Sequence, residues 1–422
     1  MFQTLYSMIN KANLTREGVR RAETSGIVSA AAANAYDAEC RFLRALAHHE
    51  LVLNFSRLYA DGNGTKDGVI YRETGIDSDA KIEEAKALKR SDFSVATVYQ
   101  KILEDLDYAE TNLPDTRAGN LKNYRATKAA AIALKMRVKL HKGDWPGVIS
   151  EGAKIVSGTT TFTSPIGAWA LPASADGAFA NNLSSESIFS FKNDATDNAG
   201  VNGAIANMLG NPANGARGLL RISPIIWSDP EWLCSDTRRT SLYSTGSTGG
   251  VVTSVYTTKY RDYATNSDAA PMIRYAEVLL ILAEAEGRSG SGVSAKALAL
   301  LNAVRNRGVS AANAFASFQD KNALIRAILK ERRIEFLAEG KRWGDIHRLA
   351  LDPDFAPIPG GGIPAKVGTS HTEVAGTYNC AGPTVAITKS IQAIPYSDRR
   401  FIWPISQAEI NQNPNFTQNP EY

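Results

Sequence analysis

The sequence contains few residues suited to metal, redox or covalent chemistry. None of its three cysteines lies in a CxxC pair, which excludes a zinc knuckle and a thioredoxin-type redox motif. None of its five histidines stands in an HExxH or similar ligand spacing, and there is neither a Walker loop nor a GxSxG elbow. These absences predict a chain with no metal, no cofactor and no catalytic residue.

The cysteines Cys40, Cys234 and Cys380 are widely spaced. Cys40 lies in a helical pattern and is expected to be a small buried apolar residue. The count allows one disulfide, but the sequence does not identify its partners.

Long apolar runs are also missing. No stretch of about 18 apolar residues occurs, so no transmembrane helix is predicted. Residues 1–10 do not show the basic and apolar regions of a signal peptide. Taken alone, these features predict a cytoplasmic protein.

An excess of charge of one sign is confined to one stretch. The net charge is +4, and residues 321–350 hold eight bases and four acids, while the rest of the chain is balanced. Because acids are interleaved with these bases, the stretch lacks the purely basic face of a nucleic-acid binder. We therefore expect no nucleic-acid partner.

What the chain does contain is helical periodicity in pairs, with small residues where neighbouring helices meet. The spacing is typical of tetratricopeptide-like pairs, which stack into a superhelical scaffold. We predict a mainly α fold, a single domain over 1–422, with helix pairs at 33–113, 125–158, 271–308 and 321–351.

Local signals place several helix ends. Gly143 and Asp144 form a predicted turn, Pro271 is expected in a first helical turn, and Ser294 is a predicted N-cap.

Two regions interrupt the helices. Residues 159–270 are rich in Gly, Ser, Thr and Asn and include GGVVTSVYTTKYRDY, which predicts short strands. A Pro- and Gly-rich loop with a C-terminal motif follows at 352–422.

The charged stretch itself predicts a structural ion-pair brace at a helix–helix turn. Charges of both signs on either side of Gly340 can pair across the turn, since an Arg guanidinium suits bidentate pairing with carboxylates. An anion-binding face is the alternative. The predicted brace comprises Glu331, Arg332, Glu335, Glu339, Arg342 and Asp345.

Two further chemistries were weighed. The stretch from Asp61 resembles a calcium loop, but Thr74 occupies the place of the bidentate Glu, so a polar loop is favoured. Paired carboxylates such as Asp105 and Asp107 are what a glycoside hydrolase needs, but nothing places them in a cleft. Solvated helix faces are the simpler interpretation.

Four motifs in order resemble the SusD/RagB family of surface nutrient-binding lipoproteins. These are RYAEVLLILAEAEG, LNAVRNRG, ERRIEFLAEGKRWGDIHRL and FIWPISQAEINQNPNFTQNPEY, and AECRFLRALAHHELVLNF resembles the family's first long helix. The match extends over essentially the whole chain, but no cysteine follows a lipobox, and the family's N-terminal segment is not recognised.

The resemblance implies a non-catalytic protein with four tetratricopeptide-like helix pairs. It also implies an N-terminal lipid anchor to the outer membrane, on the cell surface, which this chain lacks. The implied partners are a glycan ligand and a SusC-like TonB-dependent transporter. The implied function is capture of oligosaccharides or polysaccharides for import; the alternative is a tetratricopeptide-type scaffold that binds peptide or protein.

The family has no fixed ligand motif, so binding residues are predicted by subtraction. Sugars stack on aromatic rings, and three tryptophans lie outside the helical motifs, in the variable region. The predicted ligand contacts are Trp227, Trp232, Trp169, Tyr71 and Tyr263. The simpler alternative is that these rings are buried, as tryptophans usually are.

Overall fold

The computed structural model describes residues 1–180, 182–368, 371 and 373–422. The chain forms two compact units, each built from separate stretches. Unit 1 comprises Met1–Ile155, Gly344–Ile363 and Ile394–Tyr422, and unit 2 comprises Val156–Trp343 and Pro364–Ala393. The prediction of one domain over 1–422 is not tested by this division and stays a prediction.

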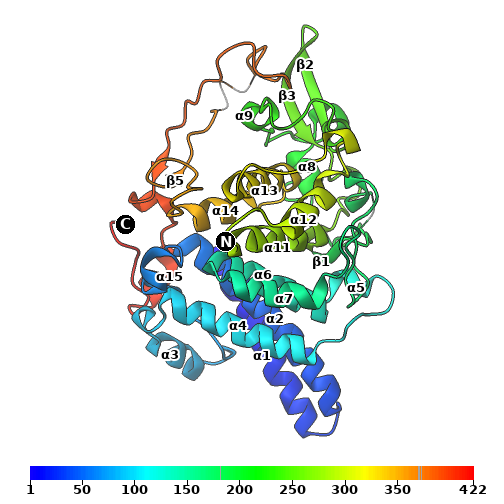
Figure 1. The fold of residues 1–422 in the computed structure, drawn as a ribbon. Helices are drawn as coiled ribbons and strands as arrows, with labels where there is room; N and C mark the ends of the chain where they lie inside the picture. The colour runs from blue at the N-terminus through cyan, green and yellow to red at the C-terminus, as the bar shows by residue number, and fades with distance from the viewer. Residues whose placement is uncertain (181, 369–370, 372) are drawn as a thin grey trace. The chain divides into compact units, whose positions relative to one another are not determined.

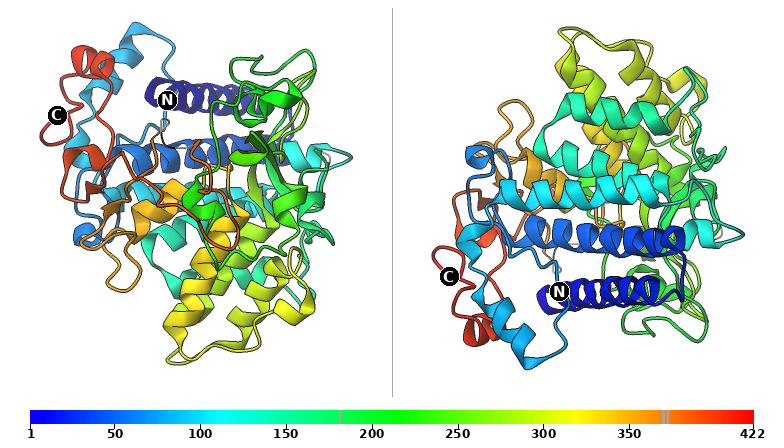
Figure 2. Two further views of the ribbon diagram at one scale, coloured as in Figure 1. Left: turned by 90° about the horizontal axis from the view of Figure 1, so that it is seen from above. Right: turned by 90° about the horizontal axis from the view of Figure 1, so that it is seen from below.

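Unit 1 is a row of helices, each packed on the next. The row runs α1 to α2, α2 to α4, α4 to α6 and α6 to α7, and Figure 2 (right) shows α1, α2 and α4 side by side. Its members are α1 (Phe2–Thr24), α2 (Ala30–Phe55), α4 (Val95–Asn112), α6 (Lys128–Lys142) and α7 (Trp145–Ile155). α1 was not predicted.

Shorter elements complete unit 1. They are α3 (Asp79–Ala87), α5 (Leu121–Tyr124), most of α14 (Arg342–Leu349), α15 (Gln407–Gln412), and the antiparallel pair β5 (Gly362–Ile363) and β6 (Ile394–Pro395).

Side-chain caps and small residues explain why these helices start, end and approach closely. Ser29 and Thr127 accept hydrogen bonds from the first-turn amides of α2 and α6. Gly143, with φ of 77°, ends α6 in the left-handed conformation, which confirms the predicted turn. The buried residues Ala129–Ala131 on α6 leave room for neighbouring backbones.

Unit 2 is built around three helices and two small sheets (Figure 1). α11 packs against α12 and α13. β2 and β3 form a hairpin turned by Gly249 and Gly250, both with positive φ, while β1 pairs antiparallel with β4. The elements are β1 (Ser187–Phe191), α8 (Ile205–Leu209), α9 (Pro224–Trp227), α10 (Arg238–Ser241), β2 (Tyr243–Thr248), β3 (Val251–Thr257), β4 (Ala270–Arg274), α11 (Tyr275–Ser289), α12 (Ala295–Arg305) and α13 (Lys321–Glu335).

The mainly α fold class is confirmed, and so are the short strands expected near residues 249–263. Ser294 caps α12 by accepting from the Ala297 amide, as predicted. The prediction for Pro271 was wrong. It lies in β4 opposite Ser190, and α11 begins only at Tyr275, because pairing with β1 holds residues 270–274 extended.

Buried histidines make unit 1 sensitive to acid. Burial lowers the pKa of His48 to about 3 and that of His347 to about 4, and it holds the pKa of His141 well below its usual value. In the unfolded chain these rings take up protons near pH 6.5. Below that pH the unfolded state therefore binds more protons than the folded state, and stability falls as the pH drops toward the folded pKa values.

We predict that the free energy of unfolding decreases by up to about 1.4 kcal/mol per buried histidine for each pH unit below 6.5. Urea unfolding at pH 7.5 and 5.5 measures this change, since carboxylates titrate mainly at lower pH. A His347→Gln variant should show a smaller difference between the two conditions. Equal stability of the parent protein at both pH values would contradict the prediction.

Candidate functional site

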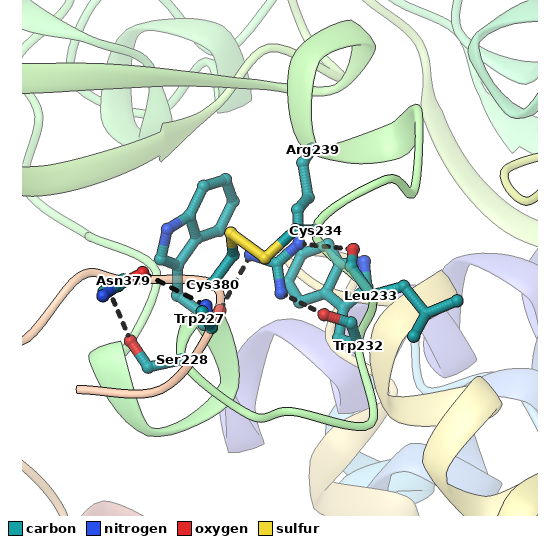
Figure 3. The surroundings of a disulfide bond; sticks show 9 residues. Trp227, Ser228, Trp232, Leu233, Cys234, Arg239, Asn379 and Cys380 are labelled. Carbon is teal, nitrogen blue, oxygen red and sulfur yellow. Dashed lines mark hydrogen bonds between the residues drawn. A yellow bond between two sulfur atoms is a disulfide. The ribbon is translucent and has the colours of Figure 1, made fainter.

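Trp227 and Trp232 form a buried aromatic cluster in unit 2. Their ring centroids are 5.3 Å apart in an edge-on arrangement, and both rings contact Tyr243. The Arg239 guanidinium lies 4.7 Å from the Trp227 centroid and 4.2 Å from that of Trp232. Figure 3 shows this guanidinium donating hydrogen bonds to nearby backbone carbonyls, including that of Trp227 at 2.8 Å. The cluster is a packed and hydrogen-bonded core element.

A disulfide attaches a distant segment to this cluster. Cys234 and Cys380 are bonded across 146 residues of sequence. Residues 373–393, called the strap here, make further bonds beside it. The Asn379 amide donates to the Ser228 hydroxyl at 3.0 Å, and the Tyr378 hydroxyl donates to the Ile222 carbonyl at 3.0 Å (Figure 3 shows the first). The strap is thus held by one covalent bond and several hydrogen bonds.

Four of the five rings predicted to contact ligand are buried. The exposed fractions are 7% for Trp227, 0% for Trp232, 1% for Trp169 and 2% for Tyr71. Tyr71 donates a 2.5 Å hydrogen bond to Asp105 and stacks on His48 with centroids 3.7 Å apart. Stacking on a sugar needs an open ring face, which these four buried rings do not offer in this structure; that they contact ligand stays a prediction.

Tyr263 is the exception, because its ring is only half-buried. The ring lies close to Gly210, where a Cβ atom would come within 2.5 Å of the Tyr263 Cε1 atom. Its buried hydroxyl has no hydrogen-bond partner among the described residues. Only glycine at position 210 leaves room for the ring in this position.

Amide side chains gather around Tyr263, on α8, where Asn207 is buried, and on the loops beside it. Asn207 donates to Asn266, which holds the left-handed conformation with φ of 59°, and the exposed Arg217 donates to Asn202 at 2.5 Å. Asn198 reaches the second loop through the Thr265 carbonyl at 3.2 Å. We call this group the amide surface: Asn198, Asn202, Asn207, Arg217, Tyr263 and Asn266. Sequence reasoning missed five of the six, although the high Asn content of residues 193–214 was a visible signal.

The predicted brace glutamates lie in a buried network of ion pairs in unit 2. Glu335 accepts from Arg238 at 2.9 Å, from Arg307 at 2.8 Å and from Arg274 at 3.1 Å. Glu339 pairs with Arg274 at 2.8 Å and with Lys259 at 2.6 Å. Five carboxylates face five cations: Asp236, Glu186, Glu331, Glu335 and Glu339 with Arg238, Lys259, Arg274, Arg305 and Arg307.

The cations determine the charge state of this network. Burial by itself would raise the pKa of Glu335, but Arg307, Arg274 and Arg238 reverse that effect and hold the pKa well below its usual value. Glu339 likewise has a lowered pKa, since Arg274 and Lys259 outweigh its burial. Both groups are therefore carboxylates at neutral pH.

The partners differ from those predicted. The glutamates of α13 were expected to pair across Gly340 with the following helix, whereas they pair with Arg238, Arg274 and Arg307 from other segments. Arg332 lies 5.6 Å from the Phe336 ring centroid, and Arg342 opens α14. Asp345 pairs with Arg348 within α14 at 2.8 Å. Helical spacing alone could not reveal partners from distant segments.

The described residues include no helix long and apolar enough to cross a membrane. Within the same residues, no group of three or more His, Cys, Asp or Glu side chains could hold a metal ion.

Two family models match the two ends of the chain. The model described as the SusD family matches residues 233–422, and the model described as starch-binding associating with outer membrane matches residues 1–140. A SusD superfamily protein from Bacteroides fragilis is 27% identical, with a TM-score of 0.75 over 98% of this chain and 82% of that one. This chain belongs to the SusD family.

Other relatives agree with this assignment. The SusD-like protein P2 of Formosa agariphila is 25% identical over 378 residues, which are 77% of this chain and 67% of that protein. The surface glycan-binding protein A of Bacteroides uniformis, at 18% identity, shares the fold, with a TM-score of 0.68 over 99% of this chain and 84% of that one. SusD-like proteins bind carbohydrate without catalysis, so the chain is a binding protein and not an enzyme.

Removing the central carboxylate of the network should destabilise this SusD-like chain. We predict that Glu335→Ala lowers the free energy of unfolding by about 3–5 kcal/mol, because three arginines lose a buried partner. The control Glu231→Ala, whose ion pair with Lys330 is mostly exposed, should cost less than about 1 kcal/mol. Urea denaturation measures both. Unchanged unfolding of Glu335→Ala, combined with loss of glycan binding, would assign the network to the ligand site instead.

Thiol titration tests the cysteine assignment. Burial, together with Asp37 and Glu39, raises the pKa of Cys40 to about 11, so its buried thiol should not react in the native protein. Ellman's reagent should find no thiol in the native state, one after unfolding without reductant, and three after unfolding with prior reduction. Three thiols without reductant would refute the disulfide.

Loss of the disulfide should also be visible in unfolding experiments. Cys234→Ser should lower the free energy of unfolding by about 2–4 kcal/mol.

Proposed function

We propose that this SusD-like chain captures oligosaccharides or polysaccharides at the cell surface and delivers them to a SusC-like TonB-dependent transporter. The observation that carries the proposal is the pair of family models at the two ends of the chain, one of which is described as starch-binding and associating with the outer membrane. We propose that an N-terminal lipid holds the protein at the outer membrane. The chain would bind its ligand without breaking a bond.

We infer that the amide surface contacts the glycan. Carbohydrate sites combine an aromatic ring, which packs on the apolar C–H face of a sugar, with polar groups that fix its orientation. Tyr263 offers a half-exposed ring whose hydroxyl is buried, and Asn202 and Arg217 lie exposed on the segments before and after α8. Amide and guanidinium groups can donate to sugar hydroxyls, and amide oxygens can also accept from them.

The chemistry of this surface favours a ligand rich in hydroxyl groups. Asn202 and Asn266 bring side-chain amides to this surface, and Arg217 adds a guanidinium donor. A peptide ligand would instead need an open strand edge or an apolar groove, and the amide surface provides neither. The glycan hypothesis is therefore preferred here to the peptide-binding scaffold.

Calorimetric titration against a panel of soluble plant, host and microbial glycans tests the proposal. We expect saturable binding to one glycan class, and we expect Tyr263→Ala and Arg217→Ala each to weaken it about tenfold or more, roughly 1.4 kcal/mol. The control Tyr422→Ala removes a ring that is 40% exposed in unit 1 and should leave affinity unchanged.

Outcomes of this titration separate the function from the site. No binding to any glycan, with binding to a casein-derived peptide mixture, would favour the peptide-capture alternative. Glycan binding that is lost in Trp227→Phe but retained in Tyr263→Ala, with both variants folded, would reject the amide surface and restore the tryptophan prediction.

A further inference from the structure

A groove runs along unit 1 between α1 and α2, distant in sequence from the amide surface. Its volume is about 490 Å³, which lies within the usual range for occupied binding pockets. The lining residues are Thr4, Ser7, Met8, Lys11, Ala12 and Thr15 from α1, Tyr36, Glu39, Cys40 and Leu43 from α2, and Arg125. None of the predicted sugar contacts lines this groove.

The groove has the length and periodicity expected of a binding site for a helix. The α1 residues that line it recur every three or four positions from Thr4 to Thr15, which is one stripe along the helix. Eleven steps along a helix span about 16 Å, or about three turns. The α2 residues from Tyr36 to Leu43 form the facing stripe. Two facing stripes make an elongated trough between a pair of packed helices, and an amphipathic helix fits such a trough.

The position of α1 in its row supports the same occupant. α2 lies between α1 and α4, and α4 lies between α2 and α6, whereas α1 ends the row (Figure 2, right). In stacked-helix scaffolds each helix covers the apolar surface of its neighbour, and the terminal helix needs either a polar outer face or a further helix. Met8 and Leu43 are half-buried in the groove, and the Tyr36 ring is 44% exposed. The end of the row thus retains apolar surface.

The charges at the rim select an acidic partner. Lys11 is exposed and forms no ion pair with any residue that the structure describes. Across the groove, Glu39 is shared by two guanidinium groups, those of Arg117 and Arg125, the latter at 2.8 and 2.9 Å. The lining residues thus include two cations, Lys11 and Arg125, and one carboxylate, Glu39, so the carboxylate of a partner could pair with Lys11.

We propose that this groove binds an acidic amphipathic helix, whose apolar side chains enter between Met8 and Leu43 and whose carboxylate pairs with Lys11. This binding site is separate from the proposed glycan surface and does not depend on it. The proposal commits to a polypeptide helix rather than a sugar, because the floor of the groove is apolar and offers only one exposed ring.

Fluorescence anisotropy with designed helical peptides tests the proposal on the purified full chain. The first probe is a labelled helix of about four turns with Leu along one face and Glu flanking it, and the second replaces each Glu by Lys. We expect saturable binding of the Glu probe and at least about tenfold weaker binding of the Lys probe.

Charge reversal in the protein provides the matched comparison. Lys11→Glu should weaken the Glu probe about tenfold and strengthen the Lys probe, because the sign of the interaction is exchanged. Lys89→Glu makes the same change at another exposed lysine of unit 1 and should change neither affinity. Met8→Glu should abolish binding of the Glu probe while Met8→Leu preserves it, with melting curves confirming that both variants fold.

Several results would overturn the proposal. The proposal fails if the Glu probe does not bind saturably or if the two probes bind equally well. It also fails if Lys11→Glu and Lys89→Glu change the affinities equally. Sedimentation that reveals a dimer disrupted by Met8→Glu would assign the groove to a second copy of this chain instead. Competition of the Glu probe by a soluble glycan would assign it to carbohydrate.

Discussion

The carboxylate of Glu335 is the interaction on which unit 2 depends most. It lies at the end of α13 and accepts hydrogen bonds from Arg238, Arg274 and Arg307, which come from three other segments. Four charged groups out of water are tolerated only if each one is paired. The pairing therefore requires these four segments to be in place together, which gives unit 2 geometric definition where its loop-rich sequence has little regular secondary structure.

Unit 1 achieves its order in a different way. Its helices form a simple row, and alanines such as Ala129 and Ala130 allow close approach. One buried ion pair, between Arg44 and Asp105 with two contacts of 2.7 Å, joins α2 to α4. A row of this kind has two ends, and the α1 end retains an apolar groove with a positively charged rim. The proposed helix-binding site follows from this geometry, just as the pH response follows from histidines buried within the same unit.

The aromatic residues explain why the proposed glycan surface was hard to find. Large rings in a variable, loop-rich region were expected to serve the ligand, but that region also needs a core of its own. Trp227 and Trp232 supply this core, with Arg239 between them and a disulfide beside them. The rings are therefore packed in this core, and the glycan contacts proposed above are a half-exposed tyrosine and amide side chains near it. Composition shows such amides, but only the fold shows which of them meet.

The sequence by itself determined the mainly helical class, the family, the turn at Gly143, the cap at Ser294 and the general place of the hairpin, because these depend on contacts between residues close along the chain. It also marked residues 321–350 as an unusual concentration of charge. Only the tertiary structure decided which groups the glutamates pair with, which cysteines are bonded, which rings are buried and that residues 270–274 are extended. Each of these depends on segments tens to hundreds of residues apart, such as Cys234 and Cys380 with their separation of 146, and no local pattern encodes such distances.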